Sequence, residues 1–157
     1  MSNSLIVLLI AFQLKHYICD FPLQGEYMMG KFKPGKEFIL PLLAHTLVHA
    51  AFTILIALYF VSLEKALLLG LLDLTIHFIM DRIKASPNML GKYQALSKAD
   101  FYEHESNLRS SLEMYRPAIQ LEFDKRMKDN KKFWWALGLD QGIHHLTHYL
   151  IIYLILG

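Results

Sequence analysis

The chain has 157 residues, of which 54% are hydrophobic and 19% charged, with a net charge of +2 and a mean hydropathy of +0.29. Soluble domains carry about 25% charged residues, so this composition excludes disorder, a collagen-like fibre and a disulfide scaffold, and it favours a membrane protein. The small net charge does not indicate nucleic-acid binding, and the single cysteine, Cys19, excludes an internal disulfide.

Four apolar stretches are each close to the ~20 residues that a helix needs to cross a ~30 Å hydrocarbon core. They cover residues 4–23, 38–60, 66–83 and 133–156. None shows the alternation of a barrel strand, and the first lacks the basic segment and cleavage pattern of a signal peptide. The sequence therefore predicts an all-α, polytopic membrane protein, a four-helix transmembrane bundle formed by one domain over residues 1–157.

The connection over residues 84–132 is expected to be partly helical. Pro117 suits the first position of a helix, and Ser97, followed by Asp100, is a candidate cap of an earlier helix. Three apolar residues recur four positions apart and predict one apolar helix face: Ile119, Phe123 and Met127. We interpret the connection as a membrane-surface or lid element, with a solvated charged loop as the alternative. His104, between two glutamates, is expected to be a solvated loop residue.

The distribution of Lys and Arg predicts the orientation in the membrane. Three lie after the first stretch and eleven between Arg82 and Lys132, whereas the turn between the second and third stretches holds only Lys65. With both termini outside, the count is fourteen against one, and the positive-inside rule assigns the richer side to the cytoplasm. We therefore expect both termini on the non-cytoplasmic side and the 84–132 connection in the cytoplasm.

Seven of the eight histidines lie inside the apolar stretches, together with four aspartates. An Asp at a helix centre costs about 2.5–3.5 kcal/mol on insertion scales, so these positions need a physical reason. Within each stretch the polar residues are four apart, which places them on one helix face. The sets are His16 and Asp20; His45 and His49; Asp73, His77 and Asp81; and Asp140, His144 and His148. A four-helix bundle would bury these faces together.

Imidazole and carboxylate side chains together suit a divalent transition metal, with zinc first and manganese or iron as alternatives. The pool is large enough for one or two ions. The candidate ligands are His16, Asp20, His45, His49, His77, Asp81, Asp140, His144 and His148. Asp73 or Asp140, where not a ligand, is a candidate general base. Arg82 and Lys84 are candidate groups for holding a substrate anion at the interface.

Two other interpretations stay open for the same residues. Hydrogen bonds between His and Asp on neighbouring helices are worth only ~0.6 kcal/mol on average in membranes, which hardly offsets the cost of insertion. A proton or ion pathway built from Asp and His is the stronger alternative. Lys15, on the first stretch, is expected to extend its ammonium toward the interface.

The four polar motifs resemble those of an uncharacterised family, a domain of unknown function in small integral membrane proteins of bacteria and their phages. The motifs are HYICDFPLQ at 16–24, HTLVH at 45–49, HFIMDRIK at 77–84 and DQGIHHLTH at 140–148. More distantly, the His/Asp helices are similar to inner-membrane metal-dependent hydrolases, a fold-level analogy. HTLVH and HHLTH are also similar to the histidine boxes of membrane desaturases, but the paired aspartates fit that pattern less well.

Together these observations favour a bacterial inner-membrane, metal-dependent hydrolase whose His/Asp site is open to the cytoplasm. We expect a phosphoester or lipid-derived substrate, surrounding membrane lipids and no nucleic-acid partner, and a homo-oligomer is compatible with this reading. The alternatives are a proton- or ion-conducting protein with a His/Asp relay, and a phage-type membrane interaction protein with a structural metal.

Overall fold

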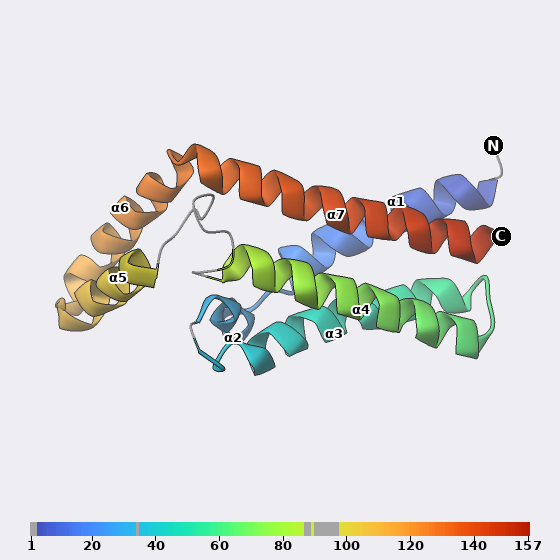
Figure 1. Ribbon diagram of the computed structural model, residues 1–157, viewed down its shortest axis with the longest axis horizontal. Helices are drawn as coiled ribbons and strands as arrows, with labels where there is room; N and C mark the ends of the chain where they lie inside the picture. The colour runs from blue at the N-terminus through green and yellow to red at the C-terminus, as the bar shows by residue number, and fades with distance from the viewer. Residues whose placement is uncertain (1–2, 34, 87–88, 90–97) are drawn as a thin grey trace.

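Four long helices form the body of the protein in the computed structural model, which describes residues 3–33, 35–86, 89 and 98–157 (Figure 1). They are α1 (Asn3–Asp20), α3 (Ile39–Leu58), α4 (Leu63–Ala85) and α7 (Lys131–Leu156). Every regular element within the described residues is helical, so the all-α prediction is confirmed. The four expected stretches correspond to these four helices.

Shorter helices connect the long ones. The segment between α1 and α3 contains α2 (Glu26–Met29) and η1 (Gly30–Phe32). The expected partly helical connection contains α5 (Lys98–Ser110), η3 (Glu113–Tyr115) and α6 (Arg116–Lys128). Pro117 is the second residue of α6, close to the expected helix start. The proposed cap at Ser97 lies outside the described residues, as do the side chains of Asp100 and Met127.

Local chemistry accounts for where the long helices begin and end. α1 ends at Asp20, before residue 23, because Pro22 disfavours helical geometry in the residue that precedes it. α4 begins earlier than expected because the Ser62 hydroxyl accepts from the backbone N–H of Lys65 at 3.4 Å. Likewise, the Asn130 side chain accepts from the backbone N–H of Lys132 at 3.0 Å and caps α7.

The two ends of the bundle differ in what they carry. The start of α1, the end of α7 and the turn between α3 and α4 lie at one end (Figure 1). The short helix α2 and the pair α5–α6 lie at the other end (Figure 1). Both connections between long helices that hold Lys and Arg residues therefore lie at the same end of the molecule, opposite the termini.

Polar and apolar side chains are divided between the two halves of the bundle interior. At the end with the termini, the helices pack through a cluster of buried apolar residues: Leu8, Phe12, Ala57, Ala66, Leu69, Ile151, Ile152 and Ile155. Toward the other end, the buried side chains are mostly histidine, aspartate and lysine. Large apolar side chains also cover the outer face of all four long helices. The molecule therefore carries much of its polarity inside and much of its apolar surface outside.

Among the described helices, α3 alone is long and apolar enough to cross a membrane on length and composition. α1, α4 and α7 fall short of that criterion, and each carries charged residues of the polar interior: Lys15 and Asp20, Asp73 and Asp81, and Asp140. The mean hydropathy of a helix is lowered by each charged residue, even where a charged group on another helix neutralises it. The indication of a membrane span from composition is thus limited to one helix.

The pair α5–α6 packs through the apolar face expected on α6. Ile119 and Phe123 lie opposite α5 and line a cavity of about 170 Å³ with it. The His104 ring stacks on the Phe123 ring at 3.9 Å, and its Nε2 lies 3.0 Å from Gln120 Oε1. His104 lies within α5, so the expectation of a loop position was wrong, and the aromatic face of α6 half-buries its imidazole.

Close packing of α3 on α4 depends on Gly70, and this gives a first prediction. A Cβ atom at Gly70 would lie 2.7 Å from Ile54 Cδ1 and 3.3 Å from the Ala50 carbonyl oxygen. We expect Gly70→Leu to lower the free energy of unfolding by about 1–3 kcal/mol through overpacking. The control is Gly142→Leu on α7, where a Cβ meets nothing within 4 Å. Thermal unfolding in detergent would measure both, and equal stability of the two variants would contradict the packing.

Candidate metal centre

The polar faces of the four long helices meet in the half of the bundle nearer α2. All six histidines of the expected ligand pool are buried, as are Asp81 and Asp140, and the Asp20 side chain is only 15% exposed. The spacing of four residues explains this, because it holds each set of side chains on the face that turns inward. The structure thus brings together, in one cluster, residues up to 132 positions apart in the chain.

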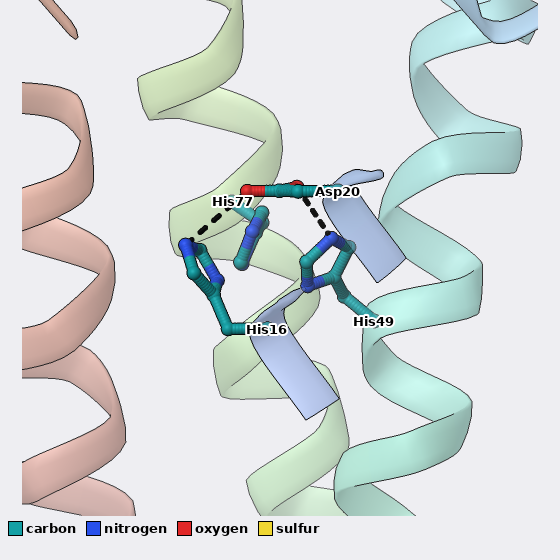
Figure 2. A group of neighbouring side chains, drawn as sticks. All are labelled: His16, Asp20, His49 and His77. Atoms are coloured by element: carbon teal, nitrogen blue, oxygen red, sulfur yellow. Dashed lines mark hydrogen bonds and ion pairs between the residues drawn. The ribbon is translucent and has the colours of Figure 1, made fainter. Parts of the chain in front are cut away.

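Four of these side chains form what we call the metal-centre group: His16, Asp20, His49 and His77 (Figure 2). They come from α1, α3 and α4, and one potential ligand atom of each lies within 4.8 Å of the others. The Asp20 carboxylate links two imidazoles, with Oδ1 3.0 Å from His49 Nε2 and Oδ2 3.2 Å from His16 Nε2 (Figure 2). Three imidazoles and a carboxylate are a ligand set that zinc accepts.

Buried imidazole nitrogens without partners support this reading. Within the described residues, His16 Nδ1, His49 Nδ1 and His77 Nε2 are buried and have no hydrogen-bond partner. Leaving a buried polar atom unpaired costs about 1–3 kcal/mol, and native proteins satisfy almost all such atoms. His45, His144 and His148 also have unpaired ring nitrogens. A cation is one partner that such unpaired imidazole nitrogens can accept.

Asp73 lies behind the metal-centre group and orients one of its members. Its Oδ1 is 3.3 Å from His77 Nδ1, and the other His77 nitrogen is the unpaired Nε2. Metal-binding histidines commonly donate their second N–H to a carboxylate, which holds the ring and its tautomer. Thr53 Oγ1 and Lys15 Nζ both donate to Asp73 Oδ2 at 2.6 Å. Asp73 is therefore fixed from both sides.

Lysine ammonium groups occupy the other places where a cation could bind. Lys15 Nζ lies between Asp73 Oδ2, at 2.6 Å, and His148 Nε2, at 3.2 Å. A second cluster of possible ligands consists of Asp81, Asp140 and His144. There, Lys84 Nζ lies 2.6 Å from Asp140 Oδ2 and 3.4 Å from Asp81 Oδ1.

Lys31 completes the neutralisation of that second cluster. Its Nζ donates to Asp81 Oδ2 and to Gln24 Oε1, both at 2.8 Å. Lys84 lies just beyond the expected membrane segment 66–83, and although its burial disfavours the charge, Asp81 and Asp140 raise the pKa of its ammonium. The Lys84 side chain therefore stays protonated at neutral pH. The geometry fits one metal ion at the metal-centre group better than it fits two.

Two lysines differ from what the sequence predicts. Lys15 is only 2% exposed and is paired with Asp73, so the expectation that it extends toward the interface was wrong. Lys31 is equally buried, and sequence reasoning counted it only as an orientation signal. The sequence feature that could have indicated the burial of Lys31 was Gly30, because a Cβ atom there would lie 2.8 Å from Pro41 Cγ. Only glycine lets η1 approach α3 closely enough for Lys31 to enter the bundle.

The two candidate anion-binding groups separate in the structure. Lys84 belongs to the buried cluster, whereas the Arg82 guanidinium lies 3.4 Å above the Phe38 ring. Arg82 also donates toward the Lys33 and Lys31 carbonyl oxygens, at 3.4 and 3.5 Å. It therefore holds the α1–α3 connection against α4 and does not point into the metal-centre group.

The remaining candidates surround the metal-centre group. The His45 Nε2 atom is 3.1 Å from Asp81 Oδ2 and 3.4 Å from Asp20 Oδ1, so His45 joins the two clusters. His144 Nε2 is 3.2 Å from Asp140 Oδ1, and its ring stacks on His77 at 3.7 Å. The roles of Asp73 and Asp140 as general bases stay predictions, and both carboxylates are engaged by lysine.

A family model matches the chain over residues 7–156, and its description reads "Protein of unknown function (DUF3307)". No curated protein and no solved structure matches the chain.

The ion pair of Lys15 with Asp73 gives a second prediction. Removing one partner of a buried pair leaves an uncompensated charge, so we expect Lys15→Met to cost about 3–5 kcal/mol of unfolding free energy. The double variant Lys15→Met/Asp73→Asn should regain much of this stability. As control, Lys33→Met breaks an exposed pair of 3.8 Å with Glu37 and should cost about 0–1 kcal/mol. Denaturation in detergent measures the free energy of unfolding of all three variants. If Lys15→Met were as stable as the double variant, the result would contradict the pairing.

Proposed function

The chain belongs to the DUF3307 family, whose description assigns no activity, and on that premise we propose that it is a multi-pass protein of the bacterial inner membrane with a metal-dependent hydrolase site. The observation that carries the proposal is the metal-centre group. Three imidazoles and one carboxylate from three helices converge within 4.8 Å, inside a bundle whose outer face is apolar.

The distribution of polarity supports the membrane location. On α1, α4 and α7 the buried charged groups turn inward and are paired, as in the contacts of Lys15 with Asp73 and Lys84 with Asp140. Intramembrane ionisable residues characteristically face the bundle interior and pair there. Outward-facing side chains on the same helices include Val7, Ile10, Leu68, Leu146 and Tyr153, all well exposed. A bilayer would cover this surface, which water would leave as a large apolar patch.

A catalytic metal would supply one chemical function here, namely a bound water whose pKa falls toward ~7. Catalytic zinc sites keep one coordination position open for this water, and a three-histidine set is one known arrangement. Asp20 is the most exposed of the four residues in the metal-centre group. We assign His16, His49 and His77 as ligands and Asp20 as the carboxylate that takes a proton from water.

The position of the cluster supports a substrate that arrives from the cytoplasmic side. The polar half of the bundle adjoins α2 and the connection with α5 and α6, where the Lys and Arg residues gather (Figure 1). By the positive-inside rule, this end faces the cytoplasm. A phosphoester or a lipid-derived ester fits such a site, because hydrolysis of either needs an activated water and a polarised oxygen.

A His/Asp proton relay is the second candidate, and a chain of contacts favours it. Asp140, His144, Asp81, His45 and Asp20 follow one another at separations of 3.1–3.5 Å. However, the cluster Leu8, Phe12, Ala57, Ala66, Leu69, Ile151, Ile152 and Ile155 closes the other half of the bundle. Because a relay across the membrane needs polar groups at every depth, the apolar half favours hydrolysis over transport.

The metal content of the purified protein tests the proposal directly. We expect one zinc or comparable ion per chain, retained after dialysis, and loss of that ion in His49→Ala and His77→Ala. The control is His145→Ala, because His145 lies outside the metal-centre group and contacts Gln13. Elemental analysis measures the occupancy, and absence of metal after incubation with zinc, manganese and iron would shift the assignment to the proton relay.

Asp20→Asn separates a catalytic site from a structural one. If Asp20 accepts a proton from water, the variant should keep its metal and fold while losing hydrolysis of phosphoester and lipid-ester substrates by about 10²–10⁴-fold. Metal analysis, thermal unfolding and a hydrolysis screen on the same samples give the three readouts. Loss of metal together with stability would instead indicate a closed structural site with four protein ligands.

The membrane topology gives a further prediction. In a Cys19→Ala background, Asn3→Cys should react with an impermeant maleimide on intact spheroplasts, and Ser110→Cys should react only after the membrane is opened. The reason is that α1 starts at the opposite end of the bundle from α5 (Figure 1). Equal reaction of both positions in intact spheroplasts would exclude the proposed arrangement.

A further inference from the structure

Two depressions between α1 and α7 join into one channel on the outer face of the bundle, which we call the lateral groove. One has a volume of about 610 Å³ and is lined by apolar side chains including Leu5, Leu9 and Ile152. The other has a volume of about 560 Å³ and includes Leu9, Ile10 and Leu14. Both share Leu9 and Tyr149, so the groove is continuous along the two helices.

The amide and imidazole groups of the lateral groove lie at one end. At the end nearer the metal-centre group it is lined by Gln13 and His145, with Gln13 Nε2 3.2 Å from His145 Nδ1. On α1 from Ile6 to Tyr17, Gln13 is the one exposed residue that is neither aliphatic nor aromatic. A polar group that faces lipid is costly unless it is hydrogen-bonded, so the exposed Gln13 amide favours a ligand with polar atoms at this place. The opposite end is formed by aliphatic residues, Tyr153 and Gly157.

The polar end also adjoins the proposed reaction site. The His145 ring centre lies 5.2 Å from that of His16, a member of the metal-centre group. From Leu5 to Leu14 the groove follows nine helical steps of α1, which corresponds to about 14 Å of length. Its length therefore suits a hydrocarbon chain that lies along α1, with polar atoms placed where that chain would come near the metal-centre group.

We propose that the lateral groove binds the acyl chain of a membrane lipid, with the lipid's ester or phosphate oxygens at Gln13 and His145. This inference rests on the proposed function and gives its substrate class as a lipid of the cytoplasmic leaflet, which enters sideways between α1 and α7. The polarity argues for this occupant, because a lipid is apolar along its chain and carries hydrogen-bonding oxygens at one end. A helix of a partner protein would instead need a groove that accepts side chains of different sizes along its whole length.

Photo-crosslinking tests the occupant. The purified protein is placed in phosphatidylethanolamine vesicles doped with a diazirine-bearing acyl chain, irradiated, and mapped by mass spectrometry. We expect labels to concentrate several-fold on residues 5–14 and 149–156 over the exposed apolar residues of α3 and α4. Ile10→Trp, which fills the groove, should remove most of this excess. The matched control is Val7→Trp on the same helix, since Val7 is as exposed as Ile10 but does not line the groove.

Each outcome decides the proposal. Even labelling of all four helices would overturn the proposal, and so would an equal loss of labelling in Ile10→Trp and Val7→Trp. Metal content is measured on the same samples. Groove labelling without metal would reject the hydrolase while keeping the lipid site, whereas metal without groove labelling would reject only the lipid site.

Discussion

The buried pair of Lys15 and Asp73 is the interaction on which the rest of the polar interior depends. A carboxylate that is 0% exposed and lies among helices is costly unless a cation and hydrogen-bond donors compensate it. Lys15 and Thr53 both supply these donors at 2.6 Å. With its charge balanced in this way, Asp73 can hold the His77 ring, and through it the metal-centre group. The pair thus links α1 and α4 at the boundary between the apolar and polar halves.

The same constraint organises the second cluster, where Lys31 and Lys84 balance Asp81 and Asp140. Each lysine comes from a different segment than its carboxylate partner in the closest of these contacts, so the charges also set the packing of the segments. Such pairs are weak evidence for stability, because desolvation offsets most of their attraction. Their effect is to specify one arrangement of α1, α4, η1 and α7. In this arrangement each imidazole of the metal-centre group keeps one ring nitrogen without a hydrogen-bond partner.

Division of the bundle into two halves connects folding with the proposed chemistry. Leu8, Phe12, Leu69 and Ile151 pack the half near the termini and give the helices a rigid apolar support. Side chains on such a support are held close to one geometry, which a metal centre requires. The apolar half also separates the cluster from the far end of the bundle. A polar cluster that is confined to one half of the bundle suits a reaction better than it suits conduction across the membrane.

The sequence by itself determined the helical class, the four long helices and most of the polar cluster. It could do so because the spacing of His16 with Asp20, or of His45 with His49, follows directly from the helical repeat. Lys15, Lys31 and the separation of Arg82 from Lys84 were decided only by the tertiary structure. A lysine on an apolar helix can extend to the interface or turn inward, and the choice depends on whether another helix presents a carboxylate at the same depth. Which four side chains form the metal-centre group likewise depends on how α1, α3 and α4 are rotated against one another, and that rotation comes from close packing at residues such as Gly70, which no local pattern encodes.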